Sequence, residues 1–349
     1  MTPSAFRRPP VVAIVGATGA VGVELLRCLE RRRFPLAELR LFASPRSAGT
    51  ALEFAGARLT VRALDETSFA GVDLALFSAG SAVAKRFAPQ AVAAGAVVVD
   101  NSSAFRRDED VPLVVPEINA AALAGHRGII ANPNCVAITA AVPLWPIHRR
   151  NRIERIVLAT YQAASGAGAA AMAELLQGTR AALEGRDHPP RVLRHPAAFN
   201  LFSHDSAIDP ATGYNGEETK VMAEMRKIFG DEDLRIGATC VRVPVLRAHS
   251  AAITIECAQP ITPEEARDWL AQAPGVRIVD DAERNHFPMP LEASGRDEIL
   301  VGRLRRDASD PSGRSLALFV CGDQLLKGAA LNAVQIAEKL SAVSYQPSA

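Results

Sequence analysis

Residues 11–22 read VVAIVGATGAVG, a continuous apolar run that passes directly into three closely spaced glycines. The apolar run predicts a buried strand, and the apolar residues that recur every three or four positions after it predict an amphipathic helix. Glycines between a strand and a helix let backbone N–H groups approach a pyrophosphate. The spacing of Gly16, Gly19 and Gly22 departs from the commoner G-x-G-x-x-G, but the strand and helix around it favour a dinucleotide-binding loop over a plain turn.

Four further apolar runs follow in the first third of the chain, separated by segments with helical periodicity. Strands that alternate with helices imply βαβ units and a parallel, doubly wound sheet. We therefore predict a Rossmann-like α/β domain that binds a dinucleotide. Its strands after 11–15 are predicted at 39–43, 72–77, 97–99 and 128–131.

The pattern changes after residue 135, where strand-like runs follow one another mostly without helices between them. This grouping favours a mainly antiparallel sheet in a second, α+β domain. A final helix at 325–340 is expected to return to the first domain, so we predict one domain from 1–133 with 325–349 and another at 134–324. The predicted strands of the second domain are 153–161, 234–246, 250–257, 299–306 and 315–321, and its helices are 168–183, 217–229 and 263–270.

The composition points to a small-molecule partner. The chain has 349 residues, of which 48% are hydrophobic and 22% charged, and a formal net charge of +1, so it offers no basic surface for nucleic acid or a membrane. Its five cysteines are scattered, which argues against disulfides and a metal site and suits the reducing cytoplasm. No apolar segment has the length of a signal-peptide core or a transmembrane helix.

Cys135 is a candidate catalytic nucleophile. It ends the motif NPNC, residues 132–135, where a predicted strand is followed by a predicted helix. The thiolate is the nucleophilic form of cysteine, and the N-terminal end of a helix favours it. A lone cysteine is more often a small buried hydrophobe, so this position needs support from other residues. Pro143 lies inside the same predicted helix and is expected to kink or shorten it.

The end of the second strand bears on the choice of dinucleotide. An NAD site would be expected to place an acidic residue there for the ribose hydroxyls, but this chain has Arg46 flanked by Ser44 and Ser47. An arginine between hydroxyls fits a 2′-phosphate, whereas a solvated loop arginine is the structural alternative. We therefore expect NADP as the cofactor.

Several motifs together resemble one enzyme family over nearly the whole chain. They are GATGAVG (16–22), SPRSAG (44–49), FSAG (77–80), DNSSAFR (100–106), NPNC (132–135), YQAASGAG (161–168), GEETK (216–220) and KGAALNAVQIAEKL (327–340). In this order they resemble the bacterial aspartate-semialdehyde dehydrogenases. The resemblance implies reversible conversion of aspartyl phosphate and NADPH to aspartate semialdehyde, NADP and phosphate, on the route to lysine, threonine and methionine. It also implies a homodimer or dimer of dimers, formed through the second domain.

The implied chemistry suits a thiol. A thiolate can displace phosphate from an acyl phosphate to form a thioester, and a hydride can reduce that thioester to a thiohemiacetal that releases an aldehyde. The resemblance makes Cys135 the nucleophile and His249 the general acid or base, because the family pairs an arginine with a histidine seven residues later. Gln162 resembles the residue that positions the acyl group.

The resemblance also assigns the substrate and cofactor ligands. Arg106 and Lys220 resemble the phosphate ligands, while Arg242 resembles the clamp on the α-carboxylate and Glu217 the partner of the ammonium group. Asn134 lies next to the thiol and is placed to add a side-chain or backbone donor to the substrate. The cofactor-binding set comprises Gly16, Thr18, Gly19, Ala20, Val21, Gly22, Ser44, Arg46, Ser47, Ser165, Gly166 and Gln324.

Two departures from the family pattern leave alternatives open. Val136 and Ala137 stand where the family has Ser-Thr, which removes two hydroxyls beside the thiol, and Gln324 stands for the usual Asn near the nicotinamide. The first departure is the only support for a non-catalytic paralogue that acts as a binding partner. The other alternative is an N-acetyl-γ-glutamyl-phosphate reductase, which shares the architecture but which the motifs at 132–135 and 217–220 disfavour.

Overall fold

The computed structural model describes Phe6 and residues 8–342, which form two compact units. The first holds the described residues up to Asn134 and those from Ala329 onward, and the second runs from Cys135 to Gly328. The predicted borders stood at 133/134 and 324/325. The second unit thus keeps four more residues near its carboxyl end, 325–328, of which Gly328 lies against Cys135.

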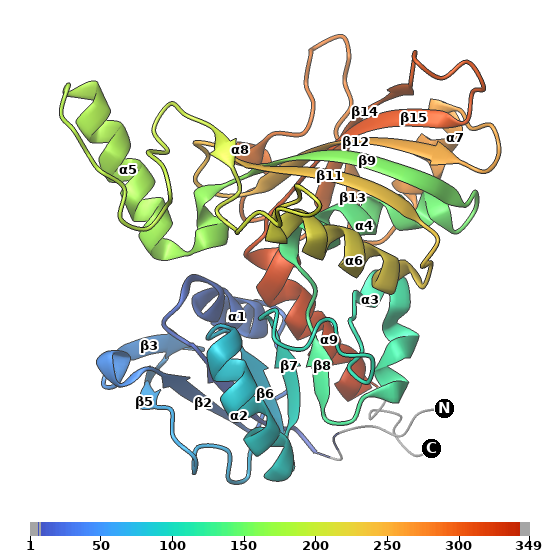
Figure 1. Ribbon diagram of the computed structural model, residues 1–349. Coiled ribbons are helices and arrows are strands. Elements are labelled where there is room, and N and C mark those ends of the chain that lie inside the picture. Colours follow the sequence, from blue (N-terminus) through green and yellow to red (C-terminus); the bar gives the residue numbers. More distant parts are fainter. Residues whose placement is uncertain (1–5, 7, 343–349) are drawn as a thin grey trace. The chain divides into compact units, whose positions relative to one another are not determined.

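The first unit contains a parallel six-stranded sheet in the order β5-β2-β1-β6-β7-β8 (Figure 1). The strand β1 lies between β2 and β6, so the strand order reverses beside it. In such sheets ligands bind beyond the carboxyl ends of the strands at this reversal. The strands are β1 (Val11–Val15), β2 (Glu38–Ala43), β5 (Arg62–Ala63), β6 (Leu74–Phe77), β7 (Val97–Asp100) and β8 (Ile129–Ala131). These positions confirm the predicted doubly wound domain.

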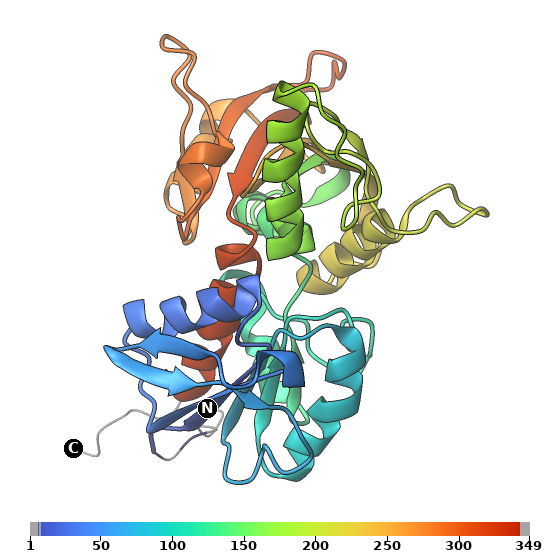
Figure 2. The same ribbon diagram turned by 90° about the vertical axis from the view of Figure 1, so that its left-hand side faces the viewer.

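Helices α2 and α9 pack against β7 of this sheet, and α1 packs against α9 and β1. The expected final helix at 325–340 divides into a π-helical turn, Leu326–Ala330, and α9, which begins at Leu331. A hairpin of β3 and β4, visible as two adjacent arrows in Figure 2, was not predicted because most of its side chains are exposed and show no apolar pattern. The bounds are α1 (Ala20–Arg31), α2 (Ser81–Ala93), α3 (Pro116–Asn119), α9 (Leu331–Ala342), β3 (Ala51–Phe54) and β4 (Ala57–Thr60).

The second unit is built on a seven-stranded sheet in the order β10-β11-β9-β12-β15-β14-β13. Four neighbouring pairs are antiparallel and two, β11 with β9 and β13 with β14, are parallel, which confirms a mainly antiparallel sheet. The strands are β9 (Ile153–Gln162), β10 (Phe202–Ser203), β11 (Arg235–Arg242), β12 (His249–Cys257), β13 (Val276–Ile278), β14 (Ile299–Arg306) and β15 (Ser315–Gly322).

The predicted strand 234–246 was wrong at its carboxyl end. The observed strand, β11, stops at Arg242, and the chain turns through residues 243–248 before β12 begins. Pro244 has no N–H for the sheet ladder, and Ala248 adopts φ +74°, which no strand allows. The early end of β11 is what leaves Arg242 beside this turn.

One face of this sheet is covered by α4, α6 and α7, which also contact one another (Figure 1). The helix α4 is almost entirely buried and runs unbroken through Pro143 and Pro146 to His148. The expectation that Pro143 shortens it was therefore wrong. The helix α5 and the loop after it stand apart from these three helices. The bounds are α4 (Cys135–His148), α5 (Ala169–Leu183), α6 (Gly216–Phe229), α7 (Pro263–Ala271) and α8 (Pro290–Ala293).

Candidate active site

Cys135 is the first residue of α4, as predicted, and its side chain is partly exposed. The side chains of Val136 and Ala137 are buried, so they pack in the interior instead of forming a polar surface beside the thiol. The π-helical turn passes over Cys135 at Gly328. A Cβ atom at residue 328 would lie 2.8 Å from the Cβ of Cys135 and 3.2 Å from that of Gln324. Only glycine therefore allows this approach of the backbone to the thiol residue.

Gly328→Ala is expected to lower kcat by about 10²-fold, because the added methyl must displace the backbone that carries Cys135, and an error of about 1 Å at a reacting atom has a cost on that scale. Steady-state rates and the rate of alkylation of Cys135 would measure the change. Gly237→Ala is the matched control, since a Cβ at residue 237 of β11 meets nothing within 4 Å. Equal rates in the Gly328→Ala and parent proteins would contradict the packing role.

The strand pairing brings three predicted residues to one edge of the sheet. The parallel strands β9 and β11 end side by side at Gln162 and Arg242, which are register partners, and β12 begins at the same edge with His249. The Nη1 of Arg242 donates to the carbonyl of Ala163 at 2.9 Å, and its Nη2 forms an ion pair with Asp205 at 3.2 Å. The Nε of Arg242 is buried and has no hydrogen-bond partner among the described residues.

His249 is 1% exposed, and its Nδ1 accepts a hydrogen bond from the backbone N–H of Ala163 at 2.9 Å. Its Nε2 is buried without a partner among the described atoms. Burial, followed by the positive charge of Arg242, lowers the pKa of His249 to about 3, while Glu217 acts in the opposite direction. The imidazole is therefore neutral near pH 7.

The loop after β9 lies directly against these two side chains. A Cβ at Gly166 would lie 2.9 Å from the Nε2 of His249 and 3.2 Å from the Nη1 of Arg242. Gly166 and Ser165 were predicted as cofactor ligands from the resemblance. The structure places both in a short 3-10 turn, Ala164–Ala167, in which Ser165 is buried.

A second group of predicted residues meets at the start of α6. The Nε2 of Gln162 donates to the Oε1 of Glu217 at 3.2 Å, and the Oε2 of Glu217 lies 3.6 Å from the Nζ of Lys220. The helix begins there because Asn215 and Glu218 form a capping box, which leaves Glu217 in the first turn. Thr160, which the sequence did not indicate, donates to the Oε1 of Gln162 at 3.0 Å and fixes its amide.

Gln324 links the loop after β9 to the residue that precedes His249. Its side chain is 2% exposed, and its Oε1 accepts from the N–H of Ala248 at 2.9 Å while its Nε2 donates to the hydroxyl of Ser165 in a short bond. Both ends of the amide are therefore engaged inside the second unit. Its Cβ is also one of the atoms nearest to Gly328.

Two predicted substrate ligands belong to the first unit. Arg106 is buried after β7, where its Nε donates to the carbonyl of Asn132 at 2.9 Å and its Nη2 donates to that of Asn101 at 2.7 Å. Asn134 is buried and is the last residue of the first unit before Cys135. The NPNC motif thus divides between the units, with its asparagines in one and its thiol in the other.

The glycine loop has the form that its sequence predicted. Gly16 adopts φ +89°, and a Cβ there would lie 2.5 Å from the carbonyl oxygen of Ser78; a Cβ at Gly22 would lie 2.1 Å from that of Gly16. Gly19 is the N-cap of α1 and offers no capping side chain. Backbone N–H groups at an uncapped helix N-terminus form a site suited to phosphate. Thr18 lies in this turn, and Ala20 and Val21 are the first two residues of α1.

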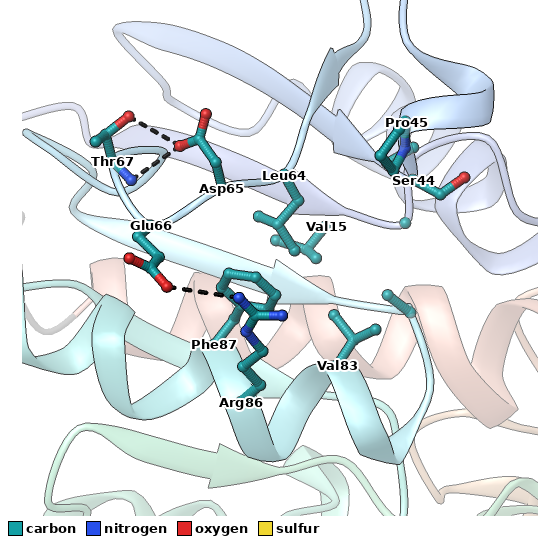
Figure 3. Close-up of a pocket in the computed structure, with 13 residues that line it drawn as sticks. Val15, Ser44, Pro45, Leu64, Asp65, Glu66, Thr67, Val83, Arg86 and Phe87 are labelled. Atoms are coloured by element: carbon teal, nitrogen blue, oxygen red, sulfur yellow. Dashed lines mark hydrogen bonds and ion pairs between the residues drawn. The ribbon is translucent and has the colours of Figure 1, made fainter.

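A cavity of about 770 Å³ opens beside the glycine loop at the carboxyl ends of β1 and β2 (Figure 3). Its lining includes Gly16, Ser44 and Pro45, together with Val83 and Arg86 of α2. Arg46 and Ser47 follow in a short 3-10 turn, Pro45–Ser47, and Arg46 is exposed. The cavity is large enough for a nucleotide and its lining is mostly apolar, as ligand pockets usually are.

Comparisons with known proteins agree with this arrangement. Residues 11–126 match the family described as semialdehyde dehydrogenase, NAD binding domain, and residues 144–327 match semialdehyde dehydrogenase, dimerisation domain. The chain is 57% identical to an aspartate-semialdehyde dehydrogenase of Synechocystis over 95% of this chain and 97% of that protein. It is 50% identical to one of Aquifex aeolicus, over 94% and 97%. The crystal structure of aspartate semialdehyde dehydrogenase II from Vibrio cholerae, complexed with ASA, superposes with a TM-score of 0.92 at 43% identity, over 95% and 98%.

Proposed function

The chain belongs to the aspartate-semialdehyde dehydrogenases, and on this premise we propose that it catalyses the reversible, NADP-dependent reductive dephosphorylation of L-aspartyl 4-phosphate to L-aspartate 4-semialdehyde. This step serves the biosynthesis of lysine, threonine and methionine. The observation that carries the proposal is the joint presence, in one unit, of Cys135 at a helix N-terminus and of buried Gln162, Arg242 and His249 at one sheet edge.

Cys135 attacks the acyl carbon of the substrate, the carbon–oxygen bond to phosphate breaks, and phosphate leaves as a thioester forms. Bound NADPH supplies the hydride that reduces this thioester. His249 faces the resulting oxyanion as a donor, and Gln162 orients the acyl group beside the sulfur. Loss of the thiolate then releases the semialdehyde and regenerates Cys135.

The carboxylate and the ammonium group on the α-carbon of the substrate require side chains of opposite charge. Arg242 is suited to the α-carboxylate, because its buried Nε has no partner among the residues that the structure describes and an unpaired buried donor is costly unless a ligand meets it. Glu217 is suited to the ammonium group, since it is buried and already faces one ammonium, that of Lys220. The phosphate is assigned to Lys220 and Arg106 on the family resemblance, and Asn134 is placed beside the thiol to add a donor.

The cofactor fits the first unit. Gly16 and Gly22 let the backbone of this turn pack closely against Ser78 and against itself, where a Cβ would clash. The uncapped N-terminus of α1 that follows is suited to a pyrophosphate, and the cavity beside Ser44 is suited to the nucleoside. Arg46 and Ser47 are proposed to bind the 2′-phosphate. From the second unit, Ser165, Gly166 and Gln324 remain candidates for the nicotinamide end.

Arg46→Ala is expected to raise the Kd for NADP by roughly 10- to 10²-fold and to leave the Kd for NAD nearly unchanged, because a charge-assisted hydrogen bond to the 2′-phosphate contributes on that scale. Fluorescence titration with each cofactor measures both constants. Arg58→Ala, at another exposed arginine of the same unit, should change neither. Equal weakening of both cofactors would mean that Arg46 supports the loop and does not read the phosphate.

A turnover assay tests the proposed function directly. The purified chain is supplied with NADP, phosphate and either L-aspartate 4-semialdehyde or N-acetyl-L-glutamate 5-semialdehyde, and nicotinamide absorbance is followed. Turnover of the first substrate alone is expected. Preference for the second would assign the chain to the acyl-phosphate reductases of that type, and turnover of neither would support a non-catalytic paralogue.

We also propose that the chain forms a homodimer through the uncovered face of the seven-stranded sheet. On that face the side chains of Val157 and Tyr161 in β9 are 41% and 39% exposed, and Tyr161 contacts Phe319 of β15 with ring centroids 6.1 Å apart. Exposed apolar side chains on a sheet favour packing against a second sheet. Light scattering on the purified chain distinguishes a monomer, a dimer and a dimer of dimers.

Among the described residues, no helix has both the length and the apolar character needed to cross a membrane. All five cysteines are free thiols, and we place the reaction in the cytoplasm, where thiols stay reduced.

A further inference from the structure

Gln324, which the sequence marked only as a cofactor ligand, is buried in the second unit. Its amide joins two loops of the second unit, residues 163–166 after β9 and residues 245–249 before β12. These loops also pair directly, since the N–H of Ala164 donates to Val245 at 2.8 Å and that of Ser165 donates to Leu246 at 3.0 Å. Gln324 adds a side-chain link at each loop, to Ser165 and to Ala248.

The hydrogen bond between Gln324 and Ala248 involves a residue with a strained backbone conformation. Ala248 adopts φ +74°, which is unfavourable for a residue with a Cβ, and it immediately precedes His249. A strained conformation persists only where its surroundings hold it, and the hydrogen bond from the Ala248 N–H to Gln324 is such a support. The direction in which His249 leaves the loop therefore depends on Gln324.

The paired loops also decide which ring nitrogen of His249 carries the proton. A backbone N–H can only donate, so the Nδ1 that receives the N–H of Ala163 must present a lone pair. In a neutral imidazole the proton then resides on Nε2, the nitrogen that faces Gly166 and has no partner among the described atoms. A neutral ring in this tautomer has no lone pair at Nε2 with which to accept a proton.

We propose that Gln324 is a positioning residue for His249: by clamping the 163–166 and 245–249 loops it holds the imidazole as the Nε2–H tautomer, a hydrogen-bond donor to the substrate oxygen. The proposal rests on the proposed function for the identity of that oxygen. When hydride reaches the thioester carbon, the electron pair of the carbonyl moves to oxygen, and Nε2–H donates a hydrogen bond to it. No proton has to leave His249 in this step.

The test compares Gln324→Met with Gln324→Glu in the full chain. Methionine has a similar length but makes neither bond, whereas the carboxylate of glutamate accepts from Ala248 and, after rotation of the hydroxyl, from Ser165. We expect Gln324→Met to lower kcat by about 10- to 10²-fold, with KM for NADP changed less than twofold, and Gln324→Glu to recover most of the loss. Gln272→Met, at an exposed glutamine of the same unit, is the control.

A second readout needs no turnover. Nitrogen-15 NMR of the labelled protein, with the His249 signals assigned by their loss in His249→Asn, reports the tautomer directly. The parent should show Nε2–H and no titration of His249 from pH 5 to 8, in a site where Arg242, Glu217 and His204 are the interacting charged or titratable groups. Gln324→Met should give a mixture of tautomers or a broadened signal.

Several outcomes would overturn the proposal. An Nδ1–H tautomer in the parent would do so, as would an unchanged His249 signal in Gln324→Met. A rise in KM for NADP with kcat preserved would make Gln324 a cofactor ligand instead. If the parent shows no turnover, the proposed function fails, but the NMR result still decides whether Gln324 positions His249.

Discussion

Cys135→Ala is expected to abolish turnover completely while NADP binding survives, because no thioester can form without the nucleophile and the glycine loop lies in the other unit. The parent protein is mixed with aspartyl phosphate, the reaction is quenched, and the peptides are analysed by mass spectrometry. An acyl adduct is expected on Cys135 alone. The other thiols of the second unit are buried, and burial raises the pKa of Cys240 and Cys257 to about 12 and that of Cys321 to about 11. They stay protonated and unreactive near pH 7.

Cys257→Ala is the matched control, since it removes a buried thiol at the far end of β12 and should leave kcat within about twofold of the parent. Appreciable turnover in Cys135→Ala, or an adduct on another cysteine, would show that the nucleophile has been misassigned. Loss of NADP binding in the same variant would mean that the substitution disturbs more than the thiol.

His249→Asn is expected to lower kcat by about 10² to 10³-fold, the usual cost of removing one hydrogen-bond donor to an oxyanion, with little change in KM. The amide oxygen of asparagine can still accept the N–H of Ala163, so the loop should stay in place while the Nε2 donor is lost. His195→Asn, at an exposed histidine, serves as the control. A drop below tenfold would argue that another group stabilises the oxyanion.

The same substitution should change how stability depends on pH. The pKa of His249 is about 3 in the folded protein and about 6.5 in an unfolded chain, so the unfolded state binds the proton first as pH falls. Its contribution to stability is complete above pH 6.5 and is lost as pH falls from 6.5 toward 3. Denaturant titrations at several pH values should show a shallower acid decline in His249→Asn than in the parent.

Both sheets were predictable because their main strands are continuous or alternating apolar runs, a signal that is local in sequence. The runs at β1 and β6 are wholly buried, and β9 alternates between a covered and an uncovered face. Exposed or two-residue elements such as β3, β4 and β10 carry no such signal, so they were missed. The predicted length of β11 was wrong because apolar residues continue past Pro244, where the sheet ladder cannot.

The candidate site also combines features that adjacent residues predict with features that they do not. The glycine loop and the start of α4 at Cys135 follow from neighbouring residues, and the resemblance named the polar residues that accompany them. The roles of Gln324 and Gly328 were out of reach, since nothing near them in the sequence indicates that one bridges two loops and the other lies against the thiol residue.

Local patterning was thus enough for the two-unit architecture, the glycine turn after β1 and the start of a helix at Cys135, because a strand, a tight glycine turn and a helix N-terminus are each specified by adjacent residues. The protonation state of His249 is different. It depends on an N–H donated by a residue 86 positions away, and that contact exists only because β9 and β12 pair in one register and burial excludes water from the imidazole. Such contacts arise when distant segments pack together, and no local pattern encodes them.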